Sequence, residues 1–152
     1  MTPHARALDI ARVLYYNETN NKSNRKEAVP VQLQESGEMY LETIYVLSKR
    51  MTAVRSIDVG EHMGFSKPSV SRAIGLLKNG GLVESDAYGH LTLTEAGRAV
   101  AERTYERHRL LKEYFIRIGV DDETANADAC KIEHHISDKT IQALREHLEQ
   151  MK

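Results

Sequence analysis

The segment at residues 128–135, DACKIEHH, spaces three potential metal ligands about one helical turn apart. Cys130, Glu133 and His134 stand at positions i, i+3 and i+4, so on a helix all three project from one face. A thiolate, a carboxylate and an imidazole together suit a first-row transition metal. His108, on the preceding predicted helix, would join them if the two helices pack together. Taken alone, each residue also has a structural interpretation, such as Cys130 as a small buried apolar side chain.

A second group of residues, at 56–81, has the pattern of a helix-turn-helix. The segment SIDVGEHM is followed by Gly64, a suitable residue to end a helix, and Ser66 then caps a helix with Pro68 in its first turn. The second helix of such a unit typically lies in the major groove of DNA. The residues predicted to meet DNA are Ser66, Lys67, Pro68, Ser69, Ser71, Arg72 and Lys78. Arg72 could bind guanine with two hydrogen bonds. The alternative is a helical module that binds protein.

Further elements are needed to position these two groups. A helix is predicted over about 36–50, a β-hairpin or wing over 82–93, and a long helix from 94 to about 118. Two more helices begin at 121 or 122 and at 137 or 138, each after a capping Asp or Ser. Residues 5–16 have helical apolar spacing, and the Asn-rich segment 17–27 is predicted to be a linker.

Composition limits the class of protein. The chain has 152 residues and a formal net charge of −1, and its single Cys excludes an intramolecular disulfide and fits a reducing compartment. No apolar run is long enough to span a membrane and no apolar signal core is present, so a cytoplasmic location is expected. Residues 49–81 contain six basic and two acidic side chains, a net +4, whereas residues 121–152 contain four basic and eight acidic ones, a net −4. The first segment suits phosphate and the second suits cations.

From about Ser36 to Leu148 the sequence resembles the diphtheria-toxin-repressor and manganese-transport-regulator family of metal-dependent repressors. The resemblance rests on six segments that occur in the same order: EMYLETIY, SKPSVSRAIGLLKNGGLV, LTLTEAGR, RHRLL, IGV and ADACKIEHHIS. It implies a mainly α fold, with an N-terminal winged helix-turn-helix, a C-terminal helical metal-binding and dimerisation lobe, and no SH3-like domain. The domains expected are an N-terminal helix and linker at 1–35, the DNA-binding domain at 36–100 and the metal-binding domain at 101–152.

The resemblance also implies a set of metal ligands, namely Met39, Glu42, His108, Cys130, Glu133 and His134. Met39 and Cys130 match the iron-responsive branch, whereas Glu42 matches a ligand of the manganese branch. Because a thiolate and a thioether favour softer metals than Mn²⁺, Fe²⁺ is the expected effector, with Mn²⁺ as the main alternative and Co²⁺, Ni²⁺ and Zn²⁺ able to bind in vitro. Lys112 and Asn126 stand where the iron branch has ancillary ligands, so that second site is expected to be altered or lost.

The function expected is a repressor of metal-uptake genes that acts as a homodimer on a palindromic double-stranded operator. One ion held by Met39, Glu42 and the C-terminal ligands would lock the DNA-binding lobe against the dimer lobe, so that metal controls the spacing of the recognition helices. The alternatives are a winged-helix regulator that needs no metal, a helical scaffold that binds only protein, and a metalloenzyme. A metalloenzyme would need a general base beside an open coordination position, and no surplus group of that kind is evident, so no enzymatic activity is expected.

Overall fold

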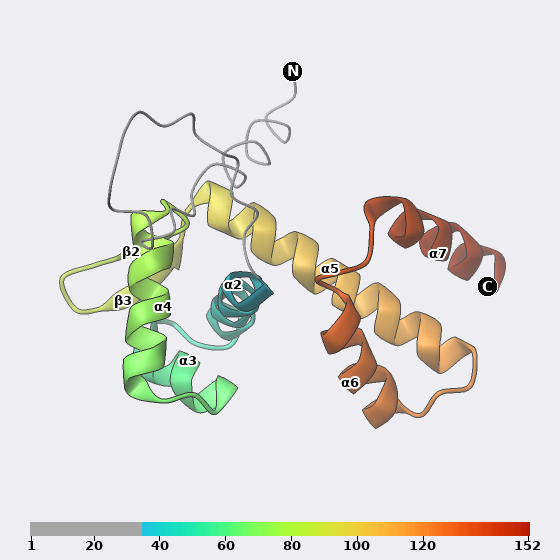
Figure 1. The fold of residues 1–152 in the computed structure, drawn as a ribbon, viewed down its shortest axis with the longest axis horizontal. Coiled ribbons are helices and arrows are strands. Elements are labelled where there is room, and N and C mark those ends of the chain that lie inside the picture. Colours follow the sequence, from blue (N-terminus) through green and yellow to red (C-terminus); the bar gives the residue numbers. More distant parts are fainter. Residues whose placement is uncertain (1–34) are drawn as a thin grey trace, which may run out of the picture. The chain divides into compact units, whose positions relative to one another are not determined.

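The computed structural model describes residues 35–152 (Figure 1). The predicted helix at 5–16, the linker at 17–27 and the other residues up to 34 of the expected 1–35 segment lie outside the described residues. The chain divides into two compact units, with the boundary between Ala101 and Glu102. No helix among the described residues is long and apolar enough to cross a bilayer.

The first unit is a helix-turn-helix followed by a hairpin. Its helices are α2 (Glu35–Ser48), α3 (Ser56–Met63) and α4 (Lys67–Asn79), and its strands are β1 (Val54–Arg55), β2 (Val83–Ser85) and β3 (His90–Leu93). The strands form an antiparallel sheet in the order β1-β3-β2, with Val54 opposite Leu91 and Glu84 opposite Thr92. The core contains the apolar faces of all three helices and the inward side chains of the strands: Leu41, Ile44, Val59, Val70, Leu77, Leu82 and Leu91 are among its buried members.

The helix α5 (Glu95–Arg117) begins directly after the hairpin, and its first turn packs closely against the backbone of Leu82. The Thr94 hydroxyl donates to the carbonyl of Gly81 at 2.7 Å and accepts from the Gly97 amide at 3.1 Å, while the Thr94 amide donates to the carbonyl of Leu82 at 3.1 Å. A Cβ at Gly97 would lie 1.9 Å from the Leu82 carbonyl oxygen, so only glycine fits there. The TEAG segment therefore fixes how α5 leaves the wing.

The second unit contains the rest of α5 with α6 (Asp122–Ile132) and α7 (Asp138–Gln150). Asp121 caps α6 by accepting from the Thr124 amide at 3.0 Å, and Ser137 caps α7 by accepting from the Thr140 amide at 3.2 Å. Leu110, Leu111, Ala129, Ile141 and Leu148 form the core of this unit. The mainly α fold with a winged helix-turn-helix is confirmed. The strand β1, which the sequence reasoning missed, is only two residues long.

Candidate metal centre and nucleic-acid interface

Three of the expected ligands meet in the second unit. His108 lies on α5, Cys130 lies near the end of α6, and Glu133 is the C-cap residue of α6. One ligand atom from each of these side chains lies within 4.8 Å of the others. His108 Nδ1 is 2.8 Å from Glu133 Oε2 and 3.6 Å from Cys130 Sγ. The cluster therefore points one nitrogen, one sulfur and one carboxylate at a common position.

These separations fit a transition-metal ion. Zinc-type bonds of about 2.1 Å to nitrogen and 2.3 Å to sulfur place a nitrogen and a sulfur about 3.6 Å apart in a tetrahedral arrangement. The Nδ1–Sγ distance is already 3.6 Å. The Nδ1–Oε2 distance of 2.8 Å is that of a hydrogen bond and would lengthen by some tenths of an ångström around an ion. The residues present can thus hold a divalent metal with small side-chain movements.

The expected helical position of His134 is wrong. The helix α6 ends at Ile132, and residues 133–135 form a turn in which the His135 amide bonds to the Ile132 carbonyl at 3.0 Å. His134 nevertheless stays beside the cluster, because its Nε2 lies 3.2 Å from Glu133 Oε1 and its side chain is only 2% exposed. The two oxygens of Glu133 thus face two different imidazoles.

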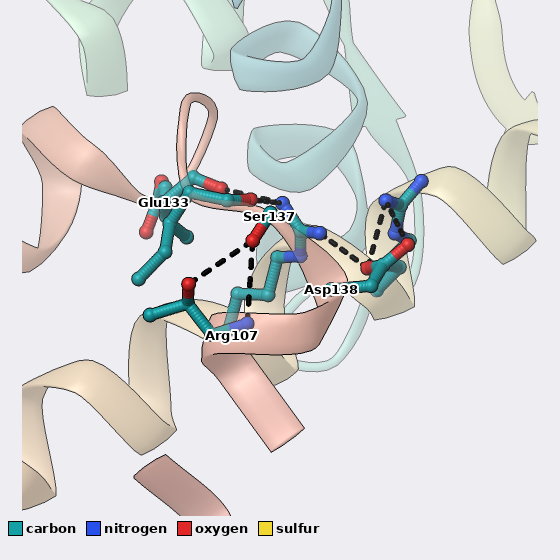
Figure 2. Close-up of polar contacts among 7 residues, drawn as sticks. Arg107, Glu133, Ser137 and Asp138 are labelled. Carbon is teal, nitrogen blue, oxygen red and sulfur yellow. Dashed lines mark hydrogen bonds and ion pairs between the residues drawn. The ribbon is translucent and has the colours of Figure 1, made fainter. Parts of the chain in front are cut away.

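Arg107 explains why the chain turns after α6. This residue, from α5, is buried, and its guanidinium donates to the carbonyls of Glu133 at 3.0 Å and Ile136 at 2.9 Å. It also pairs with Asp138 in the first turn of α7, as Figure 2 shows. Carbonyls at a helix C-terminus lack intrahelical partners, so a buried cation there satisfies them. Arg107 therefore holds the backbone of Glu133 in place. Sequence reasoning missed this residue, for which the only signal is its position next to His108.

The electrostatics of the cluster favour a protonated His108 and an ionised Glu133. Hydrogen bonding to Cys130, and then to Glu133, raises the pKa of His108 from 6.5 to about 10, against the opposing effect of burial. Burial alone would raise the pKa of Glu133, but the hydrogen bond from His108 and the nearby imidazole of His134 outweigh it and hold that pKa below its usual value. In this state the His108 proton occupies the position that a cation would take.

The other two expected ligands belong to the first unit. Met39 and Glu42 lie three residues apart on α2, and both side chains are half-buried. Their spacing places them on adjacent positions of that helix. Their ligand roles rest on the resemblance of the sequence alone and stay a prediction.

The predicted DNA-contact residues lie on α4 or cap it, and all of them are exposed: Ser66, Lys67, Pro68, Ser69, Ser71, Arg72 and Lys78. Three of them, Ser66, Ser69 and Lys78, also have structural roles. The Ser66 hydroxyl donates to Oγ of Ser69 at 2.9 Å. Ser66 caps α4 by accepting from the Ser69 amide at 3.4 Å, and Lys78 Nζ donates to the Ser85 hydroxyl on β2 at 2.7 Å. Of the expected residues, Lys67, Ser71 and Arg72 are therefore best placed to reach DNA from this face, and Arg72 offers the bidentate geometry for guanine.

The wing carries a second polar group. His90 Nδ1 lies 2.8 Å from Asp86 Oδ2, and His90 Nε2 lies 3.3 Å from an Arg55 guanidinium nitrogen. At the tip of the hairpin Tyr88 is 78% exposed, and its amide donates to Asp86 Oδ1 at 2.8 Å. An ordered, exposed hairpin next to a helix-turn-helix suits contact with a nucleic-acid backbone.

Comparisons with known proteins cover both units. Residues 32–91 match the family model "Iron dependent repressor, N-terminal DNA binding domain", and residues 94–152 match "Iron dependent repressor, metal binding and dimerisation domain". The transcriptional regulator MntR of Escherichia coli is 32% identical over 106 residues, which are 70% of this chain and 68% of that relative. The iron-dependent repressor IdeR of Mycobacterium bovis is 34% identical over 108 residues, which are 70% of this chain and 47% of that relative.

Solved structures give the same picture. The manganese regulator SloR matches with a TM-score of 0.68 and 29% identity, over 74% of this chain and 53% of that one. An IdeR from T. acidophilum matches with a TM-score of 0.68 and 26% identity, over 78% of this chain and 55% of that one. The chain thus spans about half the length of these regulators.

Proposed function

Because the chain belongs to the iron-dependent repressor family, which includes the diphtheria-toxin-repressor and manganese-transport regulators, we propose that it is a DNA-binding transcriptional repressor whose DNA affinity depends on a divalent cation. The observation that carries this proposal is the convergence of His108, Cys130 and Glu133 in a chain that also contains a winged helix-turn-helix. The relatives named are regulators of transcription, which supports a role other than catalysis.

Fe²⁺ is the effector that we propose. The cluster offers a thiol together with an imidazole and a carboxylate, and soft sulfur ligands favour metals beyond Mn²⁺ in the Irving–Williams order. Mn²⁺ is the second candidate, because two of the regulators that match, MntR and SloR, belong to the manganese type by name or description. Zn²⁺, Co²⁺ and Ni²⁺ would bind the same donors in vitro.

The ligands proposed in the second unit are His108, Cys130, Glu133 and His134. Met39 and Glu42 of α2 stay proposed ligands on the resemblance of the sequence alone. When bound, the cation supplies positive charge that replaces the His108 proton and offsets the Glu133 carboxylate. The protein's own contribution is to hold these side chains in place. Arg107 bonds to the backbone of Glu133, and the carboxylate of Glu133 bonds to His108. Metal changes DNA affinity only by binding the competent state more tightly, and a coupling of about 1–3 kcal/mol would change that affinity about 5–150-fold.

The domains proposed are a DNA-binding domain at 36–100 and a metal-binding domain at 101–152. A homodimer is proposed because paired recognition helices read half-sites one helical turn apart, and such a pair calls for a palindromic operator. A protein that acts on chromosomal DNA would reside in the cytoplasm.

The test is an anaerobic titration of DNA binding with Fe²⁺ and, separately, with Mn²⁺. The DNA is a duplex selected from a random pool with the metal-loaded protein, and binding is followed by fluorescence anisotropy. We expect chelator to weaken binding at least fivefold and Fe²⁺ to restore it at a lower free concentration than Mn²⁺. Restoration by Mn²⁺ at the lower concentration would replace iron with manganese as the effector. DNA binding that ignores chelator would refute metal control.

Two variants make this test specific. Cys130→Ala combined with His134→Ala should abolish the stimulation by metal while DNA binding in chelator stays as in the wild type. His135→Ala is the matched control, because this neighbouring imidazole is exposed and lies outside the cluster. Loss of stimulation in the control variant as well would show that the turn, rather than the ligand atoms, is responsible.

A further inference from the structure

The imidazole of His108 has two nitrogens, and they face different neighbours. Nδ1 faces Glu133 and Cys130, as described above, whereas Nε2 lies 3.0 Å from Oδ1 of Asn126. Asn126 lies on α6 four residues before Cys130, so both side chains project from the same side of that helix. The helix α6 thus contacts both edges of the ring.

A neutral imidazole has one N–H and one nitrogen with a free lone pair, and only the lone pair can bind a cation. The group that accepts a hydrogen bond from the N–H therefore decides which nitrogen becomes the ligand, and such a partner also sets the orientation of the ring. In this cluster Asn126 Oδ1 is an acceptor at Nε2. If a cation took the place of the Nδ1 proton, the remaining ring N–H would be at Nε2, where this oxygen can accept from it.

We propose that Asn126 is a positioning residue for the metal centre: it retains the Nε2 proton of His108 and so presents the Nδ1 lone pair to a single divalent cation beside Cys130 and Glu133. This inference rests on the proposed function and deepens it, since it assigns the ligand atom of His108 and limits the ring to one cation.

The next pair of residues along the two helices supports the limit to one cation. Lys112 follows His108 by four residues on α5, and Asp122 precedes Asn126 by four residues on α6. Lys112 Nζ lies 3.0 Å from Asp122 Oδ1. A second cation at Nε2 would have to replace the proton that faces Asn126, and one helical turn away it would find an ammonium, which cannot be a ligand, with the Asp122 carboxylate already paired to it. Both features oppose a second cation at this nitrogen.

The first experiment needs no variant. The Zn²⁺-loaded, ¹⁵N-labelled protein is studied by NMR correlations between the ring nitrogens and ring protons, which distinguish a protonated nitrogen from one that binds metal. We expect His108 Nε2 to carry a proton and Nδ1 to bind zinc, with one equivalent of zinc at this ring. Zinc at Nε2, or at both nitrogens, would overturn the proposal.

The second experiment compares two substitutions of Asn126. Leu is close to Asn in size but cannot accept a hydrogen bond, whereas Asp keeps an acceptor oxygen. We expect Asn126→Leu to weaken Co²⁺ and Zn²⁺ binding about 10–100-fold, the usual effect of removing a hydrogen-bond partner of a ligand, and Asn126→Asp to bind at least as tightly as the wild type. Asn79→Leu, the same change at an exposed position of α4, is the control and should leave affinity unchanged.

These outcomes separate this inference from the proposed function. Wild-type affinity in Asn126→Leu, or an equal loss in both Asn126 variants, would refute the positioning role while metal control of DNA binding still stands. Failure of the wild-type protein to bind any of these cations would refute the proposed function and this inference together. Thermal unfolding of the variants in chelator detects any loss of fold. The NMR experiment uses the wild-type protein, so its result does not depend on whether the variants fold.

Discussion

Replacement of Arg107 by Lys should destabilise the second unit by far more than the ion pair between Arg107 and Asp138 contributes. The guanidinium donates to two backbone carbonyls, of Glu133 and Ile136, and pairs with Asp138. An ammonium is a point donor that cannot reach three acceptors arranged around a planar fork. At least one buried carbonyl is then left without a partner, at about 1–3 kcal/mol for each such group. We expect Arg107→Lys to cost about 2–4 kcal/mol in the free energy of unfolding.

The ion pair itself should contribute little, because the Asp138 side chain is 76% exposed. Exposed pairs are worth about 0–1 kcal/mol, so Asp138→Asn should cost less than about 1 kcal/mol. Arg103→Lys is the matched control: Arg103 binds the same carboxylate at 3.0 Å, but its own side chain is 46% exposed. It should cost less than about 0.5 kcal/mol.

The assay is urea unfolding in chelator, followed by circular dichroism, with zinc affinity measured in parallel. Arg107→Lys should also weaken zinc binding, because the backbone of Glu133 loses its support. Equal losses of stability in Arg107→Lys and Arg103→Lys would show that the carbonyl contacts contribute nothing. A cost for Asp138→Asn as large as that for Arg107→Lys would assign the stabilisation to the ion pair instead.

Three further predictions concern the metal-ligand cluster, the first turn of α5 and the helix α4. In chelator, stability should fall as pH rises from 6.5 through about 10, because the interactions that raise the pKa of His108 stabilise the fold below 6.5 and this contribution is lost as the ring deprotonates. Stability should also fall as pH drops from about 4.5 toward the lowered pKa of Glu133 in the folded protein. His108→Gln should flatten the alkaline limb of a plot of unfolding free energy, from urea unfolding, against pH. Gly97→Ala should cost about 1–3 kcal/mol or more in thermal unfolding, since its Cβ would overlap the Leu82 carbonyl, whereas Gly75→Ala, with open space on α4, should not destabilise. Arg72→Ala should reduce discrimination between selected and random DNA by about 1–3 kcal/mol in competition anisotropy, and an equal loss on both DNAs would indicate a phosphate contact instead.

Local rules recover most of the elements from the sequence. Ser66 and Pro68 mark the start of α4, and Gly64, with a φ of 69°, marks the end of α3. Asp121 and Ser137 mark the starts of α6 and α7 in the same way. These signals lie within a few residues of the feature that they determine, so they do not depend on the tertiary structure.

The remaining features of the site depend on contacts between distant residues. Helical spacing predicts His134 on α6, but Arg107, 26 residues before Glu133, bonds to the turn and the helix ends at Ile132. The resemblance marks Asn126 only as a departure from an ancillary ligand, whereas the structure gives its amide a contact with His108. Periodicity within one helix cannot reveal such partners, because they come from another helix.

Two positively charged side chains from adjacent residues of α5, Arg107 and His108, contact the residue that ends α6. A metal ion can replace the proton of His108, but it cannot replace the charge of Arg107. Arg107 stays charged at any physiological pH and binds backbone carbonyls, so it stabilises the turn whether or not metal is present. His108 binds the Glu133 side chain through a nitrogen that can give up its proton, and a divalent cation competes for that nitrogen. Arg107 therefore maintains the fold of the turn, and the response to metal depends on His108. It follows that substitutions at Arg107 should change stability in both the metal-free and the metal-loaded protein at any pH. Substitutions at His108 should change the pH dependence of stability in the metal-free protein and also the stabilisation by metal.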